Sequence, residues 1–191
     1  MYLKRETLFS TYSPANTERI RELVSYGARI DTIKVLMACP NVDLAARTLY
    51  AATGQRPPGG SKSAPRKLAN TYTSLSNRLD LNVMVSELVD LRHANFKFED
   101  AIITVYRSYR SRIPCPVGGS AKEDSKLISF DHFYALALEL ETQASRLIRC
   151  TGCGSRNVLP PSVSAVSLRC VFCEIMTVAK KRSTPRKVAA A

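Results

Sequence analysis

Residues 150–173 read CTGCGSRNVLPPSVSAVSLRCVFC, in which Cys150 and Cys153 form one CxxC pair and Cys170 and Cys173 form a second, after sixteen intervening residues. Each CxxC turn directs two sulfurs at one ion, and two turns complete the tetrahedron that Zn²⁺ prefers. Four protein ligands leave no open position for water, so we predict one structural, non-catalytic Zn²⁺ per chain. An iron site or a redox dithiol is the alternative interpretation.

The segments before these cysteines carry the pattern of successive amphipathic helices. Apolar residues recur at i, i+3 and i+4, which is the period of one helix face. Ser129 and Asn41 are expected to cap helices, and Gly27 and Gly54 to end them. The pattern predicts helices over residues 17–26, 28–37, 42–53, 68–92, 98–109 and 130–148, the last running directly into Cys150.

Strand signals are confined to the cysteine segment, at residues 157–159 and 167–171. We therefore predict a mainly α fold, with a helical N-terminal domain that contains a helix-turn-helix-like hairpin, followed by a small C-terminal four-cysteine module of the zinc-ribbon-like kind. The expected division is a helical domain over 1–149, the module over 150–178 and a basic flexible tail over 179–191.

The charge of the chain favours a polyanionic partner. The 191 residues carry a formal net charge of +12, which attracts nucleic acid through counterion release, although solubility alone is the simpler alternative. Neither a membrane-spanning segment nor a signal peptide is apparent, so we expect a cytoplasmic protein without membrane contact. Cys39 and Cys115 stand alone and are interpreted as packed thiols.

The two helices over residues 28–37 and 42–53 have the dimensions of a helix-turn-helix. In that interpretation Asp43, Arg47, Thr48 and Tyr50 lie on the exposed side of the second helix. Pro40 departs from the usual turn, and similar hairpins occur in ordinary protein cores. The residues predicted to contact DNA are Arg47, Arg56, Lys62, Arg66, Lys67, Arg156, Lys180, Lys181 and Arg182, with a solvated basic face as the alternative.

Candidate catalytic groups are few. The chain has two histidines, His93 and His132, and both are interpreted as surface or packing residues. The phosphate-loop pattern GxxxxGK[ST] fails because Ser61 stands before Lys62, where glycine is required. We therefore predict that the protein is not an enzyme. A zinc-ribbon RNA-binding protein and a purely structural interaction protein remain alternatives to a DNA-binding regulator.

The sequence resembles the FlhC family in the GAR at 27–29, the helix from Leu44 to Gly54, the following PP and the two CxxC pairs. The resemblance implies a helical, zinc-containing subunit of a transcription activator that works with a small helical FlhD-like partner, binds double-stranded promoter DNA and recruits RNA polymerase. It also places the zinc ligands on the four cysteines of the CxxC pairs. The lack of Trp and the long loop at 57–65 favour relatives of the AcaC and SetC type, which activate conjugative-transfer genes rather than flagellar genes.

Overall fold

A computed structural model describes residues 12–59, 74–113, 127–159 and 169–183, and these form helices and one small antiparallel sheet. The helices of this part are α2 (Pro14–Ser25), α3 (Ile30–Met37), α4 (Val42–Ala52), α6 (Leu75–His93), α7 (Phe98–Arg112), α9 (Phe130–Glu141) and α10 (Val171–Ser183). The strands are β1 (Arg146–Arg149) and β2 (Arg156–Leu159). The fold is mainly helical, as predicted. No helix among the described residues is both long and apolar enough to cross a bilayer.

Local sequence signals set several helix ends. The Ser13 side chain accepts a hydrogen bond from the Asn16 amide and caps α2, and Ser129 caps α9 by accepting from the His132 amide. After α2, Gly27 adopts φ +69°, which glycine tolerates without a Cβ clash. The predicted cap at Ser129 and the helix end at Gly27 are thus confirmed.

Helices α3 and α4 form the helical hairpin that was expected, joined by residues 38–41. The turn uses left-handed backbone at two residues that are not glycine, Ala38 (φ 46°) and Asn41 (φ 56°). Asn41 holds the N-cap position of α4, but its side chain makes no capping hydrogen bond. The prediction of a side-chain cap at Asn41 was therefore wrong.

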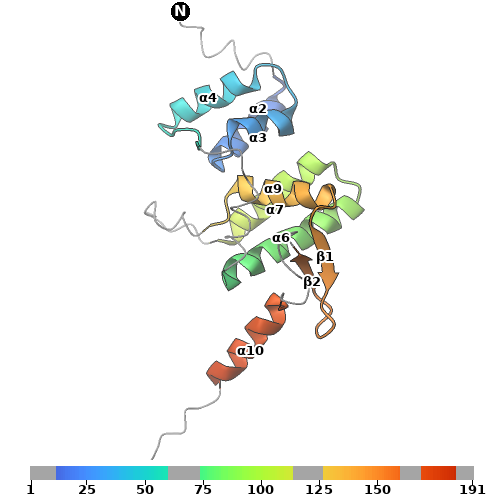
Figure 1. The fold of residues 1–191 in the computed structure, drawn as a ribbon. Helices are drawn as coiled ribbons and strands as arrows, with labels where there is room; N and C mark the ends of the chain where they lie inside the picture. Colours follow the sequence, from blue (N-terminus) through green and yellow to red (C-terminus); the bar gives the residue numbers. More distant parts are fainter. Residues whose placement is uncertain (1–11, 60–73, 114–126, 160–168, 184–191) are drawn as a thin grey trace, which may run out of the picture.

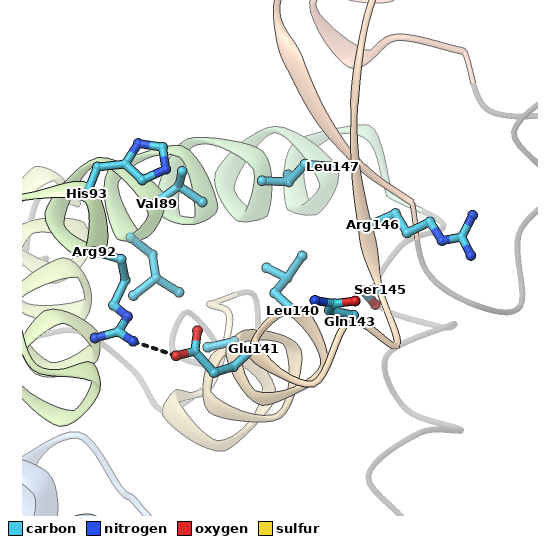
Figure 2. Close-up of a pocket in the computed structure, with 11 residues that line it drawn as sticks. Val89, Arg92, His93, Leu140, Glu141, Gln143, Ser145, Arg146 and Leu147 are labelled. Carbon is cyan, nitrogen blue, oxygen red and sulfur yellow. Dashed lines mark hydrogen bonds and ion pairs between the residues drawn. The ribbon is translucent and has the colours of Figure 1, made fainter.

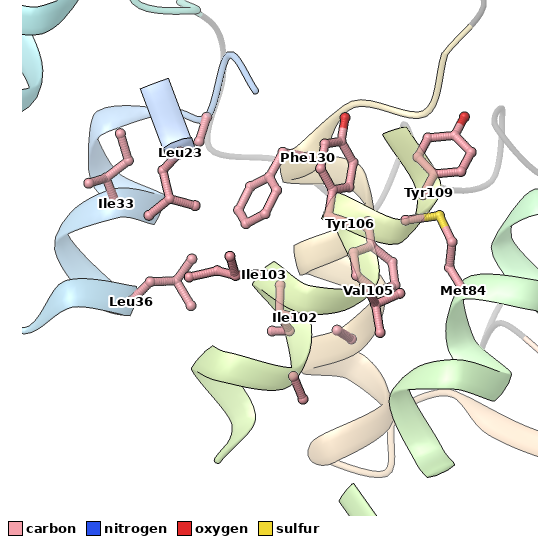
Figure 3. Close-up of a cluster of buried hydrophobic side chains, with 14 of the residues drawn as sticks. Leu23, Ile33, Leu36, Met84, Ile102, Ile103, Val105, Tyr106, Tyr109 and Phe130 are labelled. Carbon is pink, nitrogen blue, oxygen red and sulfur yellow. The ribbon is translucent and has the colours of Figure 1, made fainter. Parts of the chain in front are cut away.

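The core is centred on α7, whose buried residues face several directions because helices pack around it. Figure 3 shows Tyr106 and Phe130 facing each other, with their ring centroids 5.0 Å apart in an edge-to-face arrangement. Leu23 of α2 and Ile33 of α3 lie on the side of Phe130 that faces away from Tyr106 (Figure 3). In Figure 1, α2, α3 and α4 form one end of the molecule, and α10 lies at the other.

The segment before the cysteines differs from its prediction. Helix α9 ends at Glu141 instead of continuing to 148, and residues 146–149 form β1. β1 pairs with β2 in antiparallel register, with Leu147 opposite Val158. The strand expected at 157–159 lies in β2, but the one expected at 167–171 is wrong at Val171, which begins α10, while 167 and 168 lie outside the described residues.

The boundaries predicted at residues 149 and 178 stay predictions. The hairpin of β1 and β2 spans the first boundary, and its β2 strand packs against α6. The backbone of α10 continues through 179–183, which had been assigned to the tail, whereas 184–191 lie outside the described residues.

Candidate metal centre

The first CxxC pair forms the turn of the β1–β2 hairpin. Cys150 directly follows β1, and its amide donates to the Ser155 carbonyl at 2.9 Å, while the Gly154 amide donates back to the Cys150 carbonyl at 2.9 Å. Gly154 has φ +74°, a conformation that other residues rarely adopt. The Gly152 amide donates to the Cys150 sulfur at 3.3 Å. This turn holds the Cys150 sulfur within hydrogen-bonding distance of a backbone N–H group.

The second CxxC pair lies at the beginning of α10. Cys170 precedes the helix and its carbonyl accepts from the Glu174 amide at 3.0 Å, while Cys173 occupies the first turn. A helix start rotates residues three apart onto one face. Both sulfurs therefore point toward the hairpin turn.

The four sulfurs converge on one point. All four Sγ atoms lie within 4.8 Å of one another, with Cys150 to Cys173 at 3.7 Å and Cys153 to Cys170 at 3.6 Å. A tetrahedron with Zn–S bonds of about 2.3 Å has edges of roughly 3.8 Å. A disulfide would bring two sulfurs to about 2.05 Å, and the described cysteines are free thiols. The predicted cluster is confirmed, and its spacing fits one tetrahedral metal ion.

Two polar side chains hold the sulfurs from outside. The Ser155 hydroxyl lies 3.0 Å from the Cys153 sulfur and 3.2 Å from that of Cys170. Asn157, only 3% exposed, donates through Nδ2 to the Cys170 sulfur at 3.4 Å, and its Oδ1 accepts from the Val171 amide at 3.3 Å. Asn157 thus connects β2, the second cysteine pair and α10. Such outer partners fix the orientation of metal ligands.

The thiols differ in their ease of ionisation. Burial alone raises the pKa of Cys170, but hydrogen bonds with Ser155, the Cys173 backbone and Asn157 outweigh it and lower the pKa to about 6. Hydrogen bonds with the Cys153 and Cys150 thiols, together with burial, raise the pKa of Cys173 to about 12. Adjacent thiols compete because neighbouring thiolates repel each other. A bound cation removes this competition by stabilising all four thiolates.

The two lone cysteines were interpreted as packed thiols. Cys39 is half-buried, and its thiol bonds to the Met37 carbonyl at 2.9 Å, which agrees with that interpretation. Cys115 lies outside the described residues.

The residues predicted to contact DNA are distributed over the described part of the chain and beyond it. Arg47 is exposed on α4, and Arg56 is exposed in the segment that follows. Arg156 lies on β2 and forms an ion pair with Asp90 of α6 at 2.8 Å. Lys62, Arg66 and Lys67 lie outside the described residues, as do the side chains of Lys180, Lys181 and Arg182.

Tyr50 corrects the predicted exposed face of α4. It was expected on the exposed side with Arg47, but it is 1% exposed, and its hydroxyl donates to the Ala28 carbonyl at 2.5 Å. Thr48 is half-buried, and its hydroxyl donates to the Leu44 carbonyl of the same helix at 2.9 Å. Arg47 is thus left as the exposed residue of the predicted recognition set, with Asp43 half-buried.

The set of residues predicted to contact DNA omits three exposed arginines near the cysteines, although they belong to the basic region of the sequence from residue 142 onward. Arg146 and Arg149 lie on β1, and Arg169 directly precedes Cys170. None of the three has an acidic partner within the described residues. A signal was present in the sequence, because each cysteine pair begins with Arg-Cys, at 149–150 and at 169–170.

A separate hollow lies between α6, α9 and β1 (Figure 2). Arg92 of α6 and Glu141 of α9 form an ion pair at 2.5 Å along one side of the hollow. Leu140 of α9 and Leu147 of β1 also line it. His93 is exposed at its rim, as expected for a surface histidine.

The comparisons with known proteins give no family. The sequence matches none of the protein-family models searched, and no curated protein matches it.

Proposed function

We propose that this protein is a zinc-dependent, DNA-binding subunit of a transcription activator. The observation that carries the proposal is the convergence of four thiols at tetrahedral spacing. An all-sulfur tetrahedral donor set suits Zn²⁺, and with four protein ligands the ion would supply folding energy to the module and no catalysis. The cysteines of both pairs would hold the ion, and Ser155 and Asn157 would orient their sulfurs.

Charge supports nucleic acid as the partner. From residue 142 to 191 the sequence has nine Lys or Arg and one acid, Glu174. A zinc ion with four thiolates carries a net charge of −2, so this region stays basic with the ion bound. Glu174 is itself paired with Arg78 of α6 at 2.5 Å, which reduces its effect on a nearby phosphate.

The order of motifs supports a more specific role. The FlhC-like sequence features precede a C-terminal cysteine cluster on a mainly helical chain. We accordingly propose that the protein acts in the cytoplasm without catalytic activity, pairs with a small helical FlhD-like protein and recruits RNA polymerase to promoters. Genes of conjugative transfer are the favoured targets, ahead of flagellar genes.

The proposal is tested by capture of host DNA. The zinc-loaded full chain, alone and with a candidate helical partner, is incubated with fragmented host DNA at physiological salt, and retained fragments are sequenced. Enrichment of a few upstream regions supports the proposal, and the genes downstream separate conjugation from motility. Retention without sequence preference would favour a general nucleic-acid binder, and displacement of the DNA by added host RNA would favour an RNA-binding protein. No retention would favour a structural interaction protein.

A further inference from the structure

Two arginines face each other across the hairpin beside the metal centre. Arg149 is the last residue of β1, Arg156 is the first of β2, and the register places them directly opposite. Side chains in directly opposite positions share one face of a sheet, and like charges there are destabilising. The hairpin therefore ends in a concentrated positive charge, immediately before the first cysteine.

The neighbouring acids neutralise only half of this pair. Asp90 of α6 binds Arg156 at 2.8 Å, whereas Arg149 is exposed and has no acidic partner in the part of the chain that the structure describes. Arg146 at the other end of β1 is also exposed. Arg169 is exposed and lines a hollow beside Cys150 and Gly152. Arg149 and Arg169 thus place two guanidinium groups with open hydrogen-bonding capacity directly beside cysteines of the cluster, whereas Arg146, three residues earlier on β1, lies on the opposite face of the hairpin.

The metal site itself does not account for all of this charge. A zinc tetrathiolate with a net charge of −2 would offset two of the three exposed arginines, Arg146, Arg149 and Arg169. Lys180, Lys181 and Arg182 add three further positive charges to the C-terminal sequence. An excess of positive charge therefore remains for an external anion.

We infer that Arg149 and Arg169, here called the arginine edge, contact phosphate groups of duplex DNA. Guanidinium groups bind phosphate oxygens through two parallel N–H donors, and such contacts set the position of a protein on DNA. The metal centre fixes the edge because Cys150 and Cys170 directly follow its two arginines. This inference rests on the proposed function and specifies its binding surface.

The test compares three double variants of the zinc-loaded full chain. Arg149→Gln/Arg169→Gln removes two charges from the edge, and Arg149→Lys/Arg169→Lys keeps them. Arg21→Gln/Lys97→Gln removes the same charge from α2 and from the residue before α7, both exposed. Each protein is titrated onto a fluorescent duplex of about 30 base pairs, from 50 to 200 mM KCl, the range over which phosphate contacts dominate the salt dependence. Zinc content is measured for each.

We expect the glutamine variant of the edge to bind about tenfold more weakly at 150 mM KCl, with a salt slope smaller by about 1.8. Arg149→Lys/Arg169→Lys should keep most of the salt slope. Arg21→Gln/Lys97→Gln should match the wild type in both affinity and salt slope. Unchanged binding by the edge glutamine variant would overturn the inference while DNA binding itself stood. Loss of zinc from the edge glutamine variant would also overturn the inference, because the arginines would then be needed for metal binding and not for contact with DNA.

Failure of the proposed function gives a different result. Wild-type protein that binds no duplex at 150 mM KCl would overturn both the DNA-binding proposal and the arginine edge. Tighter binding of wild type to single-stranded RNA of the same length, lost in the edge glutamine variant, would overturn duplex DNA as the occupant.

Discussion

The side-chain oxygen of Asn82 accepts a hydrogen bond of 2.7 Å from the backbone N–H of Val158, which joins the middle of α6 to β2. Both residues are buried, and the Asn82 Nδ2 is bonded to the Arg78 carbonyl one turn earlier. Arg78 in turn pairs with Glu174 of α10. One face of α6 therefore holds both β2, the strand before the second cysteine pair, and α10, the helix that contains Cys173.

Asn82→Ala should destabilise the chain by about 1–3 kcal/mol, because the Val158 amide would stay buried without a partner. The free energy of unfolding from urea titration measures the loss. Ser76→Ala, an exposed change on the same helix, serves as the control and should alter stability by less than about 0.5 kcal/mol. Equal stability of the two variants would show that the bond does not anchor β2.

Tyr50→Phe should cost about 1 kcal/mol and leave DNA affinity unchanged. The phenol donates to the Ala28 carbonyl and is buried between α4 and the turn after α2, so only a structural hydrogen bond is lost. Thermal unfolding measures the first effect, and duplex titration measures the second. Weaker DNA binding at unchanged stability would restore the predicted recognition role of Tyr50.

Several features that depend on neighbours in the chain were predicted correctly, although the side-chain cap expected at Asn41 does not form. The cap at Ser129, the end of α2 at Gly27 and the convergence of the cysteines all follow from residues within a few positions, or from ligand chemistry. These signals act locally, so one sequence carries them in full.

Distant contacts explain what the sequence did not predict. Ala144, Leu147 and Ile148 continue the helical spacing of α9, yet Gln143 adopts φ +59° and Ser145 bonds back to Glu139. The chain then leaves the helix because Leu147 pairs with Val158, which packs against α6. The free energy that favours the strand over a continued helix comes from strand pairing and from burial between elements, and the helical spacing of apolar residues carries no information about either.

Glu22→Gln should show a pH-dependent loss of stability. Burial alone raises the Glu22 pKa, but hydrogen bonds from Arg107 and Tyr26 outweigh it and hold the pKa below its ordinary value of 4.5. A carboxyl with a lowered folded pKa contributes stability that is present above its unfolded pKa and is lost as pH falls through the folded pKa. We expect a difference of about 1 kcal/mol at pH 7, since Arg107 is largely exposed, and a shrinking difference below pH 4.5.

The control for Glu22 is Glu18→Gln. Glu18 pairs with Arg21 at 3.5 Å on the open surface of α2, so its loss should change stability little at any pH. Urea titrations at a series of pH values check both variants. A constant difference between wild type and Glu22→Gln across this range would contradict the assigned role of the Arg107 pair.

Asp131→Ala should loosen the beginning of α3. No side chain of the N-cap residue Arg29 caps that helix; instead Asp131 of α9 accepts from the Arg29 amide at 3.2 Å and from the Thr32 hydroxyl at 2.6 Å. Removing a capping carboxylate costs about 1 kcal/mol. Amide hydrogen exchange over residues 29–33 should accelerate, while Asp131→Asn, which keeps one acceptor oxygen, should retain part of the protection. Equal exchange in wild type and Asp131→Ala would refute the cap.

Cys150→Ser should remove the metal and unfold the hairpin turn with its contacts to α10. Cys150 supplies one of the converging sulfurs, and its backbone also closes the turn with Ser155 and Gly154. Because binding of the ion supplies folding energy to this short segment, its loss should expose residues 146–159 to protease. Zinc per chain and limited proteolysis together measure the result.

Cys39→Ser is the matched control for the metal centre. The Cys39 thiol bonds to the Met37 carbonyl at 2.9 Å, away from the four clustered sulfurs, and a serine hydroxyl can replace that bond. This variant should keep one zinc per chain and the protease resistance of wild type. If Cys150→Ser also kept one zinc per chain, the tetrathiolate assignment would be wrong. If chelator treatment of wild type gave the Cys150→Ser digestion pattern, the metal would be established as the element that holds the module together.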